Sequence, residues 1–217
     1  MFEMCIKAKN MMNKFGYPWF IVGDWAIELF RDKETRIHDD IEIGIYREQQ
    51  MQLFRYLGKY EKYYIDNRSR IGKYEKKEWE KEFLRLPIRE LCIEYEGSEI
   101  KILLNEKDDV DWIYGRNNKI KHERSNVIRF TNNRIPYLCP EIALLYKTEE
   151  LRNEDKDGIS KALGKMNEYE KKWFIDSIES ETIKEEIRTL DPVPNPVRHE
   201  ANALRQNFTI VDKEIPS

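Results

Sequence analysis

The chain has 217 residues, of which 40% are apolar and 36% are charged, and its formal net charge is −3. This length allows one large domain or two small ones with a hydrophobic core, and the 12 tyrosines and 5 tryptophans argue against a disordered chain. The small net charge gives no reason to expect a nucleic-acid groove, and three scattered cysteines without CxxC spacing argue against a disulfide framework or a zinc site.

The N-terminal sequence MFEMCIKAKN lacks the long apolar core of a signal peptide, and no run of 18 apolar residues predicts a membrane span. Together with the cysteine pattern, this leads us to expect a cytoplasmic protein without a membrane partner. Residues 2–14 instead predict an amphipathic helix that ends at the sequence Gly16-Tyr17-Pro18.

Two short apolar segments predict buried strands, each followed directly by a helix. The sequence WFIVG (19–23) predicts a strand that ends in glycine, and DWAIELFRD (24–32) predicts the helix after it. The sequence IEIGIY (41–46) predicts a second strand, and residues 47–57 predict the next helix.

The middle of the chain predicts mainly strands. Residues 60–86 are rich in lysine and glutamate and predict short solvent-facing strands or loops. The sequences LCIEYE (91–96) and EIKILLNE (99–106) flank Gly97-Ser98 and predict a β-hairpin. The acidic cluster at residues 108–111 is typical of a turn, and VIRF (127–130) predicts a further strand.

The last third of the chain predicts helices over residues 140–150, 155–165 and 168–188, followed by a proline-rich tail. Strands and helices therefore come first and helices alone come last. This order predicts an α+β (α/β) fold, with a mixed sheet flanked by helices over residues 1–136, a helical subdomain over 137–190 and a tail over 191–217.

The sequence HDDIEIGI (38–45) places acidic residues in a strand of alternating isoleucines. Because side chains alternate between faces, Asp40 and Glu42 point to one face, about 6–7 Å apart along the strand. Two such carboxylates repel each other unless a cation lies between them, and Mg²⁺ prefers oxygen ligands of this kind. The sequence therefore predicts a metal site at Asp40 and Glu42, although a solvent-facing edge of an amphipathic strand gives the same pattern.

The segments around this strand predict a phosphate site. Gly23 ends the first strand just before a helix, where backbone N–H groups and the helix N-terminus favour anions. Arg36 can bind phosphate through two parallel hydrogen bonds. His38 can orient a carboxylate, and a structural hydrogen bond suits it better than metal binding because the neighbouring oxygens suit Mg²⁺.

The segment VGDWAIELFRDKETRIHDDIEIGI resembles the nucleotidyltransferase motif of the aminoglycoside and lincosamide nucleotidyltransferases, within the DNA polymerase beta superfamily. The matching residues, in order and spacing, are Trp25, Ala26, Thr35, Arg36, His38, Asp40 and Glu42. LLNEKDDVDWIYGR and IPYLCPEIALLYK are also similar to segments of that group, so the resemblance covers about residues 19–165. It implies a nucleotidyltransferase fold with two Mg²⁺ ions and transfer of a nucleoside monophosphate to a hydroxyl of a small molecule such as an antibiotic.

The chain departs from this family pattern at two positions. Asp24 stands where the group has a second glycine or a serine against the triphosphate, and a carboxylate there repels phosphate. Lys101 stands where the superfamily has its third acid, and Glu99 is the candidate to replace that acid, about 6–7 Å away along the strand. Alternatively, Lys101 binds phosphate as a point charge. Lys147 matches a recurrent lysine of the group that reaches phosphates.

These residues predict a Mg²⁺-dependent nucleotidyltransferase that uses a nucleoside triphosphate, ATP being the first choice, and a small-molecule acceptor of the aminoglycoside type. The predicted catalytic residues are Asp40, Glu42 and Glu99, and the predicted nucleotide-binding residues are Gly23, Asp24, Arg36 and Lys147. Two alternatives remain open: a degenerate relative that binds a nucleotide or a partner without transfer, and an enzyme that modifies a protein in a toxin–antitoxin setting.

Overall fold

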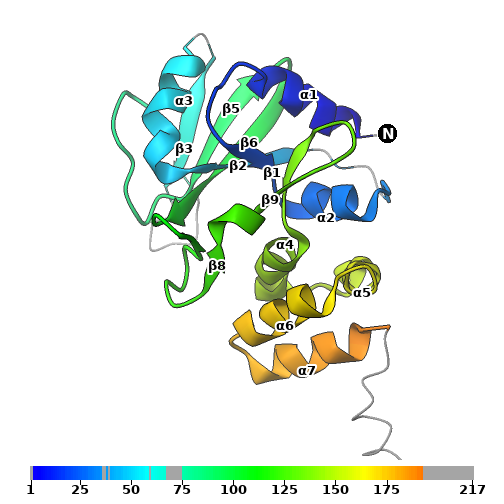
Figure 1. Cartoon of the computed structure of the whole chain (residues 1–217). Helices are drawn as coiled ribbons and strands as arrows, with labels where there is room; N and C mark the ends of the chain where they lie inside the picture. Colours follow the sequence, from blue (N-terminus) through cyan, green and yellow to red (C-terminus); the bar gives the residue numbers. More distant parts are fainter. Residues whose placement is uncertain (1, 36–37, 39, 59, 67–74, 193–217) are drawn as a thin grey trace, which may run out of the picture.

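The structure is a computed structural model that describes residues 2–35, 38, 40–58, 60–66 and 75–192 (Figure 1). The helices are α1 (Glu3–Met12), α2 (Gly23–Arg31), α3 (Gln50–Tyr56), α4 (Pro140–Lys147), α5 (Lys156–Leu163), α6 (Glu168–Ser177) and α7 (Glu181–Leu190). The strands are β1 (Trp19–Ile21), β2 (Ile41–Tyr46), β3 (Lys62–Asp66), β4 (Glu75–Glu78), β5 (Glu90–Tyr95), β6 (Ser98–Lys107), β7 (Asp111–Ile113), β8 (Lys121–Glu123), β9 (Ile128–Phe130) and β10 (Pro136–Leu138).

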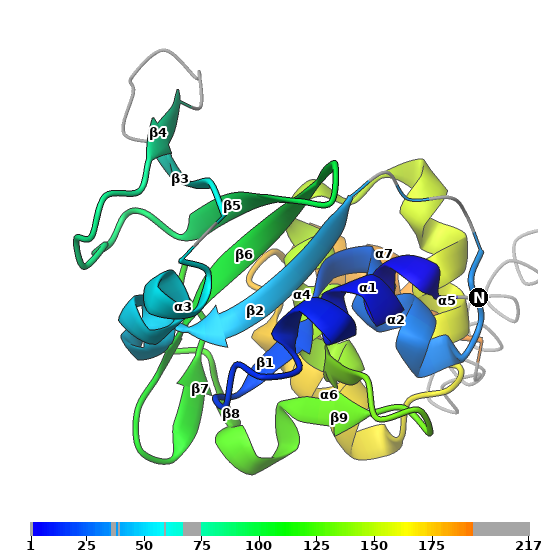
Figure 2. The same ribbon diagram turned by 90° about the horizontal axis from the view of Figure 1, so that it is seen from above.

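The strands form one mixed sheet in the order β4-β3-β5-β6-β2-β1-β10-β9, and β7 and β8 extend it from β6. β2 runs parallel to β6 and β1 runs parallel to β10, whereas β5 and β6 form the predicted antiparallel hairpin. Helices α1 and α2 both contact β2 (Figure 2). This arrangement confirms the predicted α+β class.

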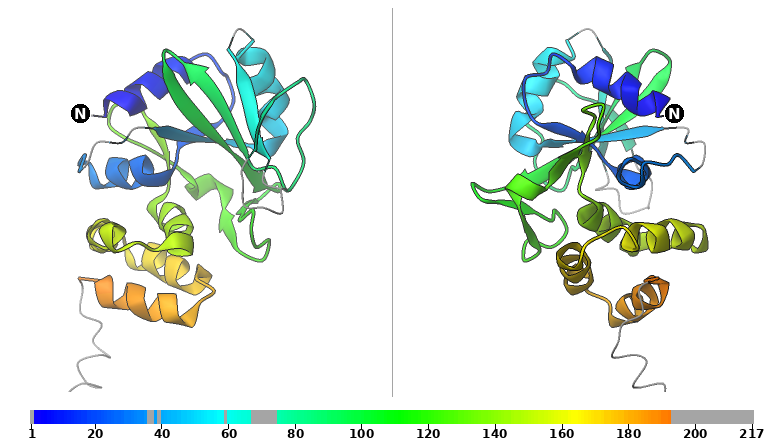
Figure 3. Two further views of the ribbon diagram at one scale, coloured as in Figure 1. Left: turned by 180° about the vertical axis from the view of Figure 1, so that it is seen from behind. Right: turned by 45° about the vertical axis from the view of Figure 1, so that its right-hand side comes forward.

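The helices at the C-terminal side form a layer beside the sheet. α2 packs on α4, α4 packs on α6, and α5 contacts both α2 and α7. Both views in Figure 3 show α7 farthest from the sheet. The predicted boundary between residues 136 and 137 falls inside β10, which belongs to the sheet, so the helical layer begins with α4 at Pro140. The predicted division into domains otherwise stays a prediction.

The core follows the alternation that the sequence predicts. Ile41, Ile43 and Ile45 are completely buried on one face of β2.

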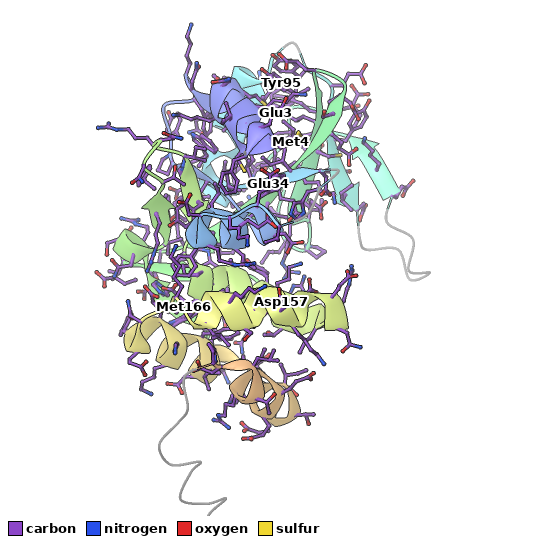
Figure 4. The ribbon with its side chains drawn as sticks, turned by 90° about the vertical axis from the view of Figure 1, so that its right-hand side faces the viewer. Glu3, Met4, Glu34, Tyr95, Asp157 and Met166 are labelled. Atoms are coloured by element: carbon purple, nitrogen blue, oxygen red, sulfur yellow. The ribbon has the colours of Figure 1, made fainter. Side chains whose placement is uncertain are left out.

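A hydrogen bond ties the start of α1 to the loop after α2. The carboxylate of Glu34, which Figure 4 labels, accepts a 2.9 Å hydrogen bond from the backbone N–H of Phe2. No helix in the described part of the chain is long and apolar enough to cross a membrane.

The structure corrects three expectations from the sequence. The helix expected over 168–188 is two helices, because the chain is extended at Ile178 and the Ser180 hydroxyl caps the N-terminus of α7. The helix expected over 47–57 opens with a 3₁₀ turn at Arg47–Gln49 before α3. The short strands β7 and β8 were not predicted. The tail lies outside the described residues from 193 onward.

A buried polar group ties β8 to α4. The Nε2 atom of His122 lies 2.9 Å from Oε1 of Glu141, and both side chains are almost fully buried. Cys139 lies beside them, and the ligand-type atoms of all three residues lie within 4.8 Å of one another. Burial, with the Glu141 carboxylate second, raises the pKa of the Cys139 thiol well above its ordinary value. These three buried side chains therefore connect β8 to the start of α4.

Replacing His122 by leucine leaves the Glu141 carboxylate buried without its partner. We therefore expect the free energy of unfolding to fall by about 3–5 kcal/mol, measured by urea unfolding. The double variant His122→Leu, Glu141→Leu removes both polar groups and should recover part of this loss. A double variant as unstable as the single one would show that packing, and not the polar pair, supports this contact.

Candidate functional site

A cavity of about 510 Å³ opens where β2, β6, α2 and α4 meet. Predicted site residues from four different segments line this cavity: Gly23, Asp24, His38, Asp40, Glu42, Lys101 and Lys147. The predicted residue Arg36 lies outside the described residues, and the described lining does not include Glu99.

The pleat of β2 places the two carboxylates on the cavity side. Because the isoleucines of β2 fill the core, the residues between them must face the other way. The side chains of Asp40 and Glu42 are 47% and 32% exposed, respectively. The structure therefore brings these two predicted metal ligands to the same face of the sheet, at the cavity.

Gly23 begins α2 directly against Glu42. Its φ is +64°, a conformation that L side chains rarely adopt, and a Cβ atom there would lie 2.5 Å from Oε2 of Glu42. The backbone N–H of the preceding Val22 donates a 3.0 Å hydrogen bond to the Glu42 carbonyl. Only glycine fits this position without displacing the carboxylate, so the N-terminus of α2 stays close to it.

The loop before β2 is held by aromatic and polar contacts. The indole N–H of Trp25 donates a 2.9 Å hydrogen bond to the Asp40 carbonyl, and the Trp25 ring lies 4.5 Å from the ring of His38. Nε2 of His38 lies 3.2 Å from Oε1 of Glu28, which also accepts from the backbone N–H of Thr35. The Trp25 indole therefore holds the backbone of Asp40, and His38 packs against Trp25 beside Glu28.

Lys101 lies between the two carboxylates. The parallel pairing of β2 and β6 places it directly beside Glu42. Its Nζ atom lies 2.6 Å from Oδ2 of Asp40 and 3.8 Å from Oε1 of Glu42. Burial lowers the pKa of Lys101, but the hydrogen bond and the charge of Asp40 outweigh this effect and leave the pKa raised. The ammonium group is therefore charged at neutral pH.

Asp24 and Lys147 form an ion pair across the cavity, between α2 and α4. Lys147 also lies 3.5 Å from Oδ1 of Asp155. This pairing gives the Asp24 carboxylate a cation to face, which reduces the repulsion expected toward a phosphate. Lys147 lines the cavity, and its two acidic partners were not predicted from the sequence.

The cavity has a near balance of charge among its described residues. Its acidic side chains are Asp24, Asp40, Glu42, Glu149 and Asp155, and its basic side chains are Lys101, Arg116, Lys147 and Arg152. Each basic side chain has a carboxylate partner: Arg116 pairs with Glu149, and Arg152 lies 3.7 Å from Glu154. These arginine pairs could not be predicted from the sequence, although Arg116 ends a segment that resembles the family.

Glu99, the predicted replacement for the third acid, lies elsewhere. Its carboxylate accepts a 2.7 Å hydrogen bond from Lys76, which also lies 3.5 Å from Glu94. Another acid on the hairpin, Glu90, was not predicted from the sequence. Burial raises the pKa of Glu90, the positive charge of Lys101 lowers it, and the net shift is upward. The geometry thus gives no support to a catalytic role for Glu99.

The residues present fit one divalent ion better than two. Asp40, just before β2, and Glu42 on β2 offer hard oxygen ligands of the kind Mg²⁺ prefers. Their shared neighbour is an ammonium group instead of a third carboxylate. Burial, opposed by the charge of Lys101, raises the pKa of Glu42, and the nearby carboxylates of Asp40 and Asp24 add to the increase. A cation at this position would relieve that repulsion.

Most of the chain is similar to known proteins. The model of the aminoglycoside-2″-adenylyltransferase family matches residues 5–161. The fold is similar to that of the lincosamide antibiotic adenylyltransferase LnuA with bound lincomycin, with a TM-score of 0.51 and 14% identity, covering 76% of this chain and 98% of that one. The crystal structure of ANT(2″)-Ia with adenylyl-2″-tobramycin gives a TM-score of 0.48 and 12% identity, covering 86% and 95%. No curated protein matches this chain.

The raised pKa of Glu42 predicts a pH-dependent effect on stability. Because the pKa is higher in the folded state, the stabilising contribution of the protonated carboxyl is lost as the pH rises through that value. The variant Glu42→Gln cannot ionise, so at pH 7 it should exceed the wild type in stability by less than about 1 kcal/mol, since the side chain is partly solvated. The gain should vanish at acid pH. Urea unfolding at several pH values between about 4 and about 8 measures this gain, because this range begins near the unperturbed glutamate pKa. A variant less stable than the wild type at pH 7 would show that the Lys101 contact outweighs burial.

Proposed function

This chain belongs to the aminoglycoside-2″-adenylyltransferase family, and we propose that it transfers a nucleoside monophosphate from a nucleoside triphosphate to a hydroxyl of a small-molecule acceptor. The family match confirms the resemblance found in the sequence. The observation that carries the proposal is the pair Asp40 and Glu42 on one face of β2, placed against Gly23 at the start of α2 within a cavity of about 510 Å³.

The triphosphate would bind at the N-terminus of α2. Gly23 has no side chain to exclude a phosphate, and the first N–H groups of a helix attract anions. The pairing of Asp24 with Lys147 reduces the repulsion that a free carboxylate would cause there. Lys147 would then exchange part of its contact with Asp24 for a phosphate oxygen. ATP is the nucleotide that we propose.

Magnesium dependence is also part of the proposal. Asp40 and Glu42 would hold a Mg²⁺ ion, with the Trp25 indole holding the Asp40 backbone and His38 packed against Trp25. When bound, the ion supplies a positive charge that offsets the charge developing on the transferred phosphate. The three cysteines are free and buried, which suits the reducing cytoplasm, and we propose that location.

The acceptor would be an antibiotic of the aminoglycoside type. A second cavity of about 230 Å³ shares Asp24, His38, Lys147 and Asp155 with the first. Its further acidic side chains are Glu28, Glu154 and Asp157, and its further basic side chain is Arg31. This excess of acidic groups would favour a cationic acceptor, such as a sugar that carries amino groups.

One observation favours a second candidate function. Lys101 lies where a third carboxylate would complete the site, and each basic side chain among the described lining residues is already paired. A protein with this arrangement could bind a nucleotide without transferring it. Measurement of pyrophosphate release distinguishes the two functions.

Pyrophosphate release from ATP with Mg²⁺ and a panel of aminoglycosides tests the proposed function. We expect release by the wild type, and a loss of about a hundredfold or more in Asp40→Asn and in Glu42→Gln, because each removes charge stabilisation worth several kcal/mol. The matched control Glu99→Gln removes an acid of the same sheet face that lies against Lys76, and should keep activity within about threefold. Nucleotide binding without release for any acceptor would favour the second candidate function, and equal losses in Glu99→Gln would contradict the geometry.

A further inference from the structure

The carboxylates of Asp40 and Glu42 already share a cation supplied by the chain itself. We propose that the ammonium group of Lys101 takes the place of one divalent metal ion between Asp40 and Glu42, so that the nucleotide site holds at most one bound metal ion. The inference deepens the proposed function and rests on it for the role of the nucleotide.

The position of Lys101 is fixed by backbone pairing, not by chance contact. β2 and β6 are parallel neighbours over their full common length, with Glu42 and Lys101 directly opposite. On its other side Lys101 faces Cys92 of β5, so it sits in the middle of three paired strands. The strand pairing keeps the Lys101 side chain on this face of the sheet, and its Nζ atom contacts Asp40 at 2.6 Å.

The charges at this point oppose the binding of two divalent ions. Asp40, Glu42 and Lys101 together carry a net charge of −1, whereas a carboxylate at residue 101 would make it −3. A divalent ion placed between Asp40 and Glu42 must displace the ammonium or lie close to it, and like charges within a few ångströms repel strongly in a partly buried site. A second ion would meet the same repulsion.

The other basic side chains of the cavity do not share this position. Among the described lining residues, Lys147 is bound to Asp24, Arg116 to Glu149, and Arg152 lies near Glu154. Lys101 alone of these four lies close to both Asp40 and Glu42. A tethered ammonium also needs no fixed octahedral ligand set, unlike Mg²⁺, so two carboxylates are sufficient for it.

Binding of Mn²⁺ alone, followed by electron paramagnetic resonance on the full chain, tests the inference without nucleotide or turnover. We expect weak binding of Mn²⁺ by the wild type and at least tenfold tighter binding by Lys101→Met, which removes the charge but keeps the length of the side chain. Lys101→Arg keeps the charge and should behave like the wild type. The matched control Lys76→Met removes a lysine that pairs with Glu99 and Glu94 outside the cavity, and should leave Mn²⁺ affinity unchanged.

Two further variants assign the effect to this site. Asp40→Asn in the Lys101→Met background should cancel the gain in affinity. Lys101→Glu should bind two Mn²⁺ ions in the presence of a non-hydrolysable ATP analogue, where the wild type binds one at most, and it carries the test if Lys101→Met does not fold.

Two ions in the wild type, or Mn²⁺ affinity in Lys101→Met within twofold of the wild type, would overturn the inference. Failure of the proposed function is a separate result. It would appear as absent pyrophosphate release with every acceptor, while the Mn²⁺ affinities of the wild type and of Lys101→Met would still differ as expected.

Discussion

Two carboxylates held on one face of a strand repel each other, and much of the structure around β2 offsets that repulsion. Because Ile41, Ile43 and Ile45 are buried in the core, the side chains of Asp40 and Glu42 must face the other way. The sheet then supplies the compensating charge from the neighbouring strand, since the parallel register places Lys101 beside Glu42. Burial still raises the pKa of Glu42 despite the nearby Lys101. The ionised Glu42 carboxylate is therefore destabilised here, and a bound cation would stabilise it.

The same region joins the sheet to the helical layer. α2 starts against Glu42 at a glycine that no other residue could replace without displacing the carboxylate. α4 packs on α2 and carries Lys147 to the side chain of Asp24. The cavity therefore lies between two layers that ionic contacts connect, and the buried pair of His122 and Glu141 anchors the start of α4 on the opposite side. A polyanion that enters must exchange partners with these ion pairs, so its binding is coupled to the contact between the layers.

The features set by local pattern could be predicted from the sequence. The alternation in IEIGIY predicts the two faces of β2, the glycine after the first strand predicts the start of α2, and Gly97-Ser98 predicts the hairpin that brings Lys101 to Glu42. The partners of charged side chains could not be predicted, because they depend on tertiary contacts between distant segments. Glu99 shows this most clearly: its strand position is as predicted, but Lys76 from another strand holds its carboxylate away from the cavity. The break between α6 and α7 was missed because a cap at Ser180 competes with an otherwise helical pattern.

The two departures from the family pattern are best understood together. An acid in place of a glycine adds negative charge at Asp24, and a base in place of an acid adds positive charge at Lys101. Each new charge has a partner of opposite sign, Lys147 and Asp40 respectively, so neither is a buried charge without compensation. The described lining is left with five acidic and four basic side chains. A strongly acidic cavity admits a triphosphate only with metal ions to neutralise it, whereas a nearly balanced one opposes the same polyanion far less. Of the two departures, Lys101 adds positive charge to this lining, whereas the negative charge of Asp24 is paired with Lys147.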